Sequence, residues 1–381
     1  MGFKCGIVGL PNVGKSTLFN ALTKTAMAQA ENYPFCTIEP NIGEVAIPDP
    51  RLYKLADIAK SENIVPTRMT FVDIAGLVKG ASKGEGLGNQ FLANIREMDA
   101  IAYVLRCFDD ANIVHVEGKI DPISDLEIVE TELMLADLET LEKREYSLEK
   151  KAKSGDRESQ DILELVQKAL VLLREGRPVR MMEIKPNGET LFKSLQLLTA
   201  KPVLYVCNVN ESDASQGNQY SQLVFDTAKK EGAGAVLISA KIEAELSQLG
   251  SNDQQEFLQE LGLEEPGLVR MIYEGYDLLD LMTFFTAGPK ESRAWTIPAH
   301  SLAPRASRAI HTDFEKGFIR AEVISFADYV ECNGEQGAKE AGKVRVEGKD
   351  YEVQDGDVVL FRFNVYKPNS PFSSGILNQI N

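Results

Sequence analysis

Residues 3–21 read FKCGIVGLPNVGKSTLFNA, and this stretch decides the fold. Its apolar start, Phe3 to Val8, predicts a short buried strand, and Leu18 to Leu22 predicts a continuing helix. Between them, Gly9 to Thr17 matches the pattern G-x-x-x-x-G-K-S/T in its required setting, after a strand and before a helix. The stretch therefore predicts a phosphate-binding loop and a nucleotide-binding protein.

The residue types in this loop suit a polyphosphate. Gly9 and Gly14 let the backbone curl so that successive N–H groups point into one concavity, beside the positive end of the helix. Lys15 is expected to reach the β- and γ-phosphates as a catalytic group, and the Ser16 hydroxyl to hold Mg²⁺. The nucleotide contacts expected here are Asn12, Val13, Gly14, Lys15, Ser16 and Thr17.

A second acidic motif follows the apolar strand Thr70 to Asp73. Asp73 is expected to hold Mg²⁺ directly or through water, and the N–H of Gly76 to meet the γ-phosphate. Thr37 stands in a proline-flanked loop and is a third candidate magnesium ligand, with an ordinary loop hydroxyl as the alternative. The glycine-rich stretch Lys79 to Gly88 is suited to ordering when the γ-phosphate is present.

Apolar strands alternate with helices through the rest of the first 280 residues. Ile101 to Phe108 is one strand, Pro202 to Cys207 ends in Asn208, and Ala235 to Ile238 ends in Ser239. Strands that carry polar residues at their carboxyl ends and alternate with helices are typical of a doubly wound α/β sheet.

The excess length between Asp73 and Asn208 is helical in pattern. Apolar residues recur mostly at threes, fours and sevens between Asp125 and Lys153, and again from Ile162 to Leu173 after the break at Ser154-Gly155-Asp156. This predicts a long antiparallel helical hairpin inserted into the nucleotide domain. Its distal end mixes both charges, so it is either a solvated helix end or an RNA contact.

Past residue 280 the pattern changes to short strands and turns, which predicts a small α+β domain. The division we expect is a nucleotide domain at 1–122 and 200–280, a helical insertion at 123–199, the α+β domain at 281–366 and a tail at 367–381. The stretch from Lys290 to Arg320 contains six basic and three acidic residues. It is the best candidate for a nucleic-acid-binding surface, and the alternative is an ordinary protein surface.

Composition limits the alternatives. The chain has 41 basic and 57 acidic residues, a net charge of −16, so any RNA contact needs a local basic patch. The five cysteines are odd in number and never spaced C-x-x-C, which favours reduced, buried thiols over disulfides or a zinc site. No long apolar run and no leader pattern are found, so we expect a cytoplasmic protein with no membrane contact.

Residues 73–88, DIAGLVKGASKGEGLG, resemble the Obg branch of the translation-factor-related GTPases. With the helical insertion, the chain's ending and Asn208-Val209-Asn210-Glu211, the whole chain resembles the YchF / Obg-like ATPase family. The resemblance implies a C-terminal TGS domain with a β-grasp fold, and a magnesium-dependent ATPase that associates with the ribosome. The expected partners are ATP and the ribosome (large subunit and 70S), with rRNA reached through the hairpin and the TGS domain, and the expected state is a monomer.

The base-reading motif departs from that of GTPases, which use Asn-Lys-x-Asp. Here Asn208 is kept, Val209 replaces Lys and Glu211 replaces Asp. Glu is one methylene longer than Asp, so its two hydrogen bonds to guanine would be misplaced. Losing such a matched pair of hydrogen bonds can reduce discrimination between bases by orders of magnitude. The residues support weakened guanine specificity, and the resemblance implies preference for ATP. We expect Asn208, Val209, Glu211 and Ser239 to frame the base.

Two further residues bear on hydrolysis. Leu77 stands where related enzymes hold a water-orienting Gln, so intrinsic hydrolysis should be slow or depend on another group. We hypothesise that His115, or a residue of the glycine-rich loop, substitutes as a catalytic group, the alternative being an exposed loop histidine. Asn12 resembles the loop Asn that binds a monovalent cation such as K⁺ in some related GTPases.

The most favoured interpretation is thus a slow magnesium-dependent ATPase acting at the ribosome. One alternative is a GTP-specific enzyme of the Obg type, in which Glu211 does the work of Asp. Another is a non-catalytic module that binds RNA or the ribosome and is only stabilised by nucleotide.

Overall fold

The computed structural model describes residues 3–30, 41–74, 87–110, 119–185 and 188–364, without the side chains of 26–30, 87 and 251. Thr37, Gly76, Leu77 and His115 lie outside the described residues. The chain divides into two compact units, one made of residues 2–47 and 68–279 and the other of residues 48–67 and those from 280 onward.

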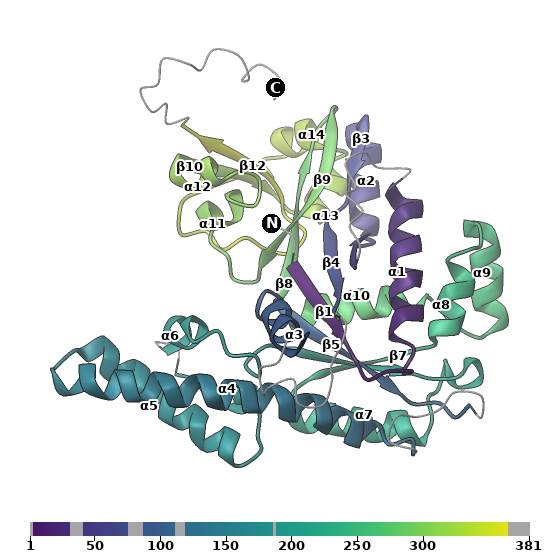
Figure 1. Ribbon diagram of the computed structural model, residues 1–381. Coiled ribbons are helices and arrows are strands. Elements are labelled where there is room, and N and C mark those ends of the chain that lie inside the picture. The colour runs from purple at the N-terminus through teal and green to yellow at the C-terminus, as the bar shows by residue number, and fades with distance from the viewer. Residues whose placement is uncertain (1–2, 31–40, 75–86, 111–118, 186–187, 365–381) are drawn as a thin grey trace. The chain divides into compact units, whose positions relative to one another are not determined.

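The first unit is built on a mostly parallel sheet (Figure 1). In spatial order its described strands are β2 (Ile42–Ala46), β4 (Arg68–Asp73), β1 (Phe3–Val8), β5 (Ala100–Arg106), β6 (Val203–Asn208) and β7 (Gly234–Ile238). Only β2 among them runs antiparallel to its neighbour. The predicted doubly wound α/β fold is confirmed, and the parallel strands bring Asp73 and Asn208 to the same edge.

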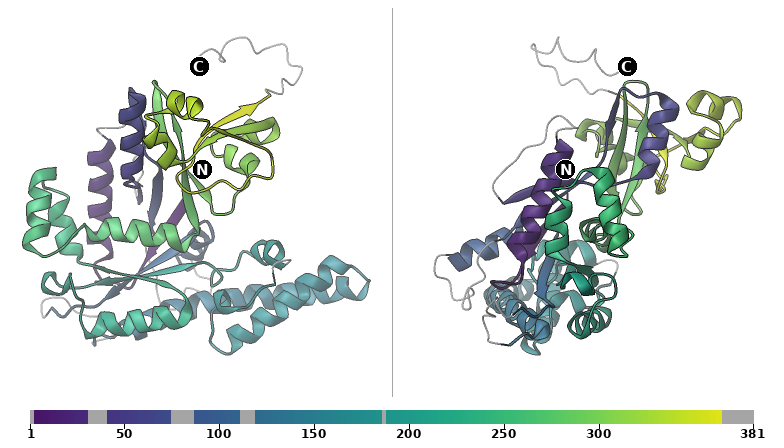
Figure 2. Two further views of the ribbon diagram at one scale, coloured as in Figure 1. Left: turned by 180° about the vertical axis from the view of Figure 1, so that it is seen from behind. Right: turned by 90° about the vertical axis from the view of Figure 1, so that its right-hand side faces the viewer.

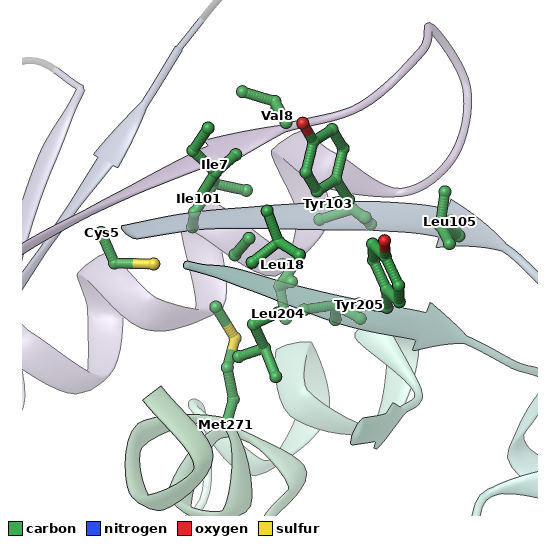
Figure 3. Packing of buried hydrophobic residues seen from close by; sticks show 14 of the residues in the cluster. Cys5, Ile7, Val8, Leu18, Ile101, Tyr103, Leu105, Leu204, Tyr205 and Met271 are labelled. Atoms are coloured by element: carbon green, nitrogen blue, oxygen red, sulfur yellow. The ribbon is translucent and has the colours of Figure 1, made fainter. Parts of the chain in front are cut away.

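Helices pack on both faces of this sheet. Its helices outside the insertion are α1 (Lys15–Ala30), α3 (Leu87–Arg96), α7 (Gln219–Glu231), α8 (Ala240–Leu246), α9 (Ser251–Glu260) and α10 (Gly267–Leu278). Tyr205 of β6 donates a hydrogen bond of 2.6 Å to Glu231 of α7, while Leu204 points the other way, toward Met271 of α10 (Figure 3). Strands β5 and β6 are buried along their whole length, as the unbroken apolar runs predict.

The inserted hairpin consists of α4 (Pro122–Lys153) and α5 (Arg157–Arg174), which lie side by side (Figure 2). The break at 154–156 is where the sequence predicts it, and Leu141, Leu148, Val166 and Leu170 pack between the helices. The chain returns to the sheet through the 3₁₀ turn η2 (Val179–Met181) and helix α6 (Glu189–Ser194).

A buried ion-pair network fixes the root of the hairpin. Arg180 of η2 contacts Glu130 of α4 and Glu231 of α7, each at 2.8 Å, with 9% of its side chain exposed. Burial raises the pKa of Glu130, and the Arg180 guanidinium opposes that shift. Because breaking a buried pair leaves an uncompensated charge, this network ties the insertion firmly to the nucleotide unit.

The second unit contains a mixed sheet. Its described strands, in spatial order, are β11 (Arg345–Glu347), β10 (Phe318–Ile324), β12 (Val358–Phe363), β8 (Leu281–Ala287), β9 (Glu291–Pro298) and β3 (Asn63–Val65). Its helices are α2 (Pro50–Ala59), α11 (Ala303–Ser307), α12 (Thr312–Lys316), α13 (Phe326–Glu331) and α14 (Glu335–Glu340). The antiparallel β8–β9 hairpin, a helical crossover and a final strand parallel to β8 at the centre make a β-grasp arrangement.

Residues 48–67, which the sequence division places in the nucleotide domain at 1–122, pack instead within this second unit. Strand β3 pairs with β9, and Leu52 and Leu55 of α2 are buried against Phe285 of β8.

No helix in the described part of the chain is long and apolar enough to cross a bilayer.

Candidate nucleotide-binding site

The phosphate loop lies between the end of β1 at Val8 and the start of α1 at Lys15, as the sequence predicts. Asn12 and Gly14 adopt left-handed φ values of 65° and 94°. A Cβ added to Gly9 would lie 2.7 Å from the carbonyl oxygen of Val104, so this position needs glycine for its close approach to β5. Ser16 and Thr17, in the first turn of α1, are exposed.

Asn208, at the carboxyl end of β6, joins the loop to the predicted base-reading segments. Its side chain is almost fully buried; Nδ2 donates to the carbonyl oxygen of Val13 at 2.8 Å, and Oδ1 accepts from the N–H of Ala240 at 2.9 Å. A Cβ on Gly14 would lie 2.1 Å from that Nδ2. The amide therefore fixes the loop and the segment after β7 relative to each other.

Lys15 forms an ion pair with Asp73, the last residue of β4. Both side chains are 13% exposed, so the pair is mostly shielded from water. Asp73 is held in place because its N–H donates to Asn41 and the N–H of Ile74 donates to Ile7 of β1, at 2.9 and 3.1 Å. The ammonium that the sequence predicts to bind phosphate thus stands beside a carboxylate of the kind that binds Mg²⁺.

At the base end, Glu211 begins the 3₁₀ turn η4 (Glu211–Asp213) and pairs with Lys241 of α8 at 2.9 Å. This contact raises the pKa of Lys241. Val209 is buried and donates its N–H to Ile238 at 2.8 Å. The Ser239 hydroxyl is buried, and no described residue hydrogen-bonds to it. A buried hydroxyl of this kind suits a polar ligand group.

The structure brings together most of the predicted residues within its described part. The phosphate loop, Asp73 and Asn208 meet at one sheet edge; Glu211 follows Asn208 closely in the chain, and Ser239 follows Ile238, the register partner of Asn208. Thr37, Gly76 and His115 lie outside the described residues. The sequence alone does not reveal Lys241 as the partner of Glu211, because the two residues are 30 apart in the chain and meet through the pairing of β6 with β7.

A strand–phosphate-loop–helix unit on a doubly wound sheet defines a P-loop nucleotide-binding protein. Residues 4–132 match a family described as "50S ribosome-binding GTPase", and residues 281–364 match the YchF-GTPase C-terminal family, described as a protein of unknown function.

Full-length relatives give the family directly. The chain is 59% identical to "Ribosome-binding ATPase YchF" of Haemophilus influenzae and 51% identical to the protein of that name in Bacillus subtilis, in each case over 96% of this chain and 100% of the relative. The solved YchF GTPase of Schizosaccharomyces pombe is 37% identical, with a TM-score of 0.84 over 95% of this chain and 98% of that chain. The chain belongs to the YchF family.

Replacing Gly14 with Ala should weaken ATP binding by about tenfold or more. The added Cβ meets Asn208 Nδ2 and the φ of 94° disfavours any side chain, so the loop must shift. Titration of ATP by calorimetry measures the effect.

The matched control for this substitution is Gly155→Ala. Gly155 also has a left-handed φ, 89°, but its Cβ would meet nothing within 4 Å. That variant should lose about 1–2 kcal/mol of stability with unchanged ATP affinity. Equal ATP affinities in the Gly14 variant and the wild type would contradict this account of the loop.

Proposed function

We propose that this chain is a magnesium-dependent ATPase with a slow intrinsic rate that binds the ribosome. The observation that carries the proposal is the junction of phosphate loop, Lys15–Asp73 pair and Asn208 at one sheet edge. The relatives named ribosome-binding ATPases, which are more than half identical to this chain over 96% of its length, support it further.

In this proposal the loop amides and Lys15 bind the phosphates, while Ser16 and Asp73 hold Mg²⁺ with Thr37. The donor set fits the ion, because hydroxyl and carboxylate oxygens are the ligands Mg²⁺ takes in such sites. The metal would supply charge neutralisation on the β- and γ-phosphate oxygens. Asp73 attracts the Lys15 ammonium, and a γ-phosphate would compete for that ammonium.

The base end supports adenine over guanine. Guanine recognition in this class uses an Asp carboxylate at the last position of the motif, whereas this chain has the longer Glu211, whose carboxylate also makes a solvent-exposed pair with Lys241. Val209 is buried and replaces the Lys whose aliphatic chain would pack along a guanine base. We propose that Asn208, Val209, Glu211 and Ser239 frame adenine. The GTP-specific alternative keeps some support from the Schizosaccharomyces pombe relative, which is titled a GTPase.

Slow hydrolysis follows from Leu77, which cannot orient a water molecule. We propose that His115 supplies this role and that the N–H of Gly76 meets the γ-phosphate.

The ribosome, at its large subunit and in the 70S particle, is the proposed partner of a cytoplasmic monomer. Arg293, whose guanidinium stacks 4.2 Å from the Trp295 ring, belongs to the basic surface proposed to contact rRNA.

Equilibrium binding of non-hydrolysable ATP and GTP analogues with Mg²⁺ tests the nucleotide assignment. We expect ATP to bind at least about tenfold more tightly, because Glu211 is longer than the Asp that reads guanine and Val209 replaces the Lys of the guanine motif. GTP binding more tightly than ATP would overturn the ATPase assignment in favour of an Obg-type GTPase. Ribosome affinity that is unchanged by nucleotide would favour the non-catalytic module.

A potassium ion at Asn12 is a further part of the proposal. Hydrolysis in K⁺ should be severalfold faster than in Na⁺, and the difference should vanish in Asn12→Gly, which removes the amide but accommodates the φ of 65°. Steady-state phosphate release measures both rates. Equal turnover of the wild type in the two salts would count against a cation at this residue.

A further inference from the structure

In the backbone that follows β5, side chains bind a run of carbonyl groups. The carbonyl oxygens of Cys107, Phe108, Asp109 and Asp110 each accept a hydrogen bond from the side chain of an Arg or Asn residue. We call these four residues the 107–110 segment.

Arg106 holds two of these carbonyls. It is among the largest fully buried side chains, with Nε donating to Phe108 at 3.2 Å and Nη2 to Asp110 at 3.4 Å. Its guanidinium also lies 4.7 Å from the centre of the Phe108 ring. In the sheet, Arg106 is the register partner of Asn208, so the segment starts beside the base motif.

Asn218 holds the carbonyl of Cys107 and is the N-cap of α7. Its Oδ1 accepts from the N–H groups of Tyr220 and Ser221, at 3.0 and 3.1 Å. Its Nδ2 donates to Cys107 O at 2.7 Å and to Asp213 Oδ2 at 2.9 Å. Both donors and both acceptor directions of the amide are thereby used.

The 107–110 segment is also hydrogen-bonded to the proposed base-reading segment, residues 208–213. The N–H of Cys107 donates to Asn208 O at 2.8 Å, and the N–H of Asp213 donates to Asn210 O at 3.0 Å. Asn210 Nδ2 reaches Asp109 O at 3.5 Å. Asn218 therefore bridges the 107–110 segment to Asp213, two residues beyond Glu211 in the same turn.

We propose that Asn218 is a positioning residue for base recognition: by joining Cys107 to Asp213 it fixes the turn that carries Glu211. The inference rests on the proposed nucleotide function and names a residue outside the base motif. Asn218 acts through Asp213 and the Cys107 carbonyl, and only an amide can both cap α7 and donate to these two acceptors.

The test separates the cap from the bridge. Asn218→Asp keeps an oxygen for the N–H groups of α7 but cannot donate, and it sets a carboxylate against Asp213 and the Cys107 carbonyl. Ser221→Ala is the matched control, because it removes the Ser221 half of the capping box, in which Asn218 N–H donates to Oγ at 2.8 Å, and leaves the bridge intact. Circular dichroism and thermal melts establish that both variants are folded.

The experiment measures how much the base contributes to affinity. Two ratios give this contribution: the Kd of inorganic tripolyphosphate divided by the Kd of ATP, and the same Kd divided by the Kd of GTP, each measured with Mg²⁺. We expect Asn218→Asp to lower this ratio about tenfold for the preferred nucleotide while the Kd of tripolyphosphate stays within about twofold of the wild-type value. Ser221→Ala should lower the melting temperature and leave the ratio unchanged, since a structural role alone does not alter base recognition.

Asn218→Asp with Asp213→Asn restores a donor between the two side chains and should recover part of the ratio. A wild-type ratio in folded Asn218→Asp, or an equal loss in Ser221→Ala, would overturn the positioning role. Should Asn218→Asp fail to fold, Asp213→Ala, which removes only one arm of the bridge, takes its place with the same expected direction. Wild-type preference for GTP would instead refute the ATPase proposal alone, since the ratio is defined for either nucleotide.

Discussion

A largely buried ammonium and carboxylate meet where β1 and β4 end, and the proposed nucleotide site is centred on this Lys15–Asp73 ion pair. The pair exists because parallel pairing sets Asp73 opposite Ile7, while the phosphate loop turns the chain so that Lys15 begins α1. Both charges have a function in the proposed chemistry: the ammonium for phosphate and the carboxylate for Mg²⁺. Together they link the phosphate loop to the strand that precedes the glycine-rich stretch.

Asn208 extends the same organisation to the base. One buried amide bonds both the carbonyl of Val13 and the N–H of Ala240, and so links the phosphate loop to the start of α8 at the proposed base end. Near it, the Glu211 carboxylate pairs with Lys241, and Asn218 donates a hydrogen bond to Asp213 in the same turn as Glu211. In the proposed site, base recognition thus involves contacts between the segments that follow β5, β6 and β7 as well as the motif residues.

Local patterns in the sequence were enough to predict the strand–loop–helix unit and the helical hairpin, because each depends on residues close together in the chain. The parallel sheet was predictable from the alternation of strands and helices. Partners distant in sequence were not predictable: Asn218 with Cys107, or Arg180 with Glu130, leave no spacing signal. The segment 48–67 was misassigned for the same reason, since its helix and strand suit an α/β unit, and only pairing with β9 reveals where it packs.

The most direct test of the account is the Mg²⁺ dependence of ATP affinity in the wild type and in Asp73→Asn, measured by calorimetry with and without the metal. If Asp73 binds Mg²⁺ and holds Lys15, Mg²⁺ should tighten wild-type binding by at least about tenfold, and most of that factor should be lost in the variant. The variant should also bind metal-free ATP more tightly than the wild type, because Lys15 is released for phosphate. An equal Mg²⁺ factor in both proteins would contradict the account.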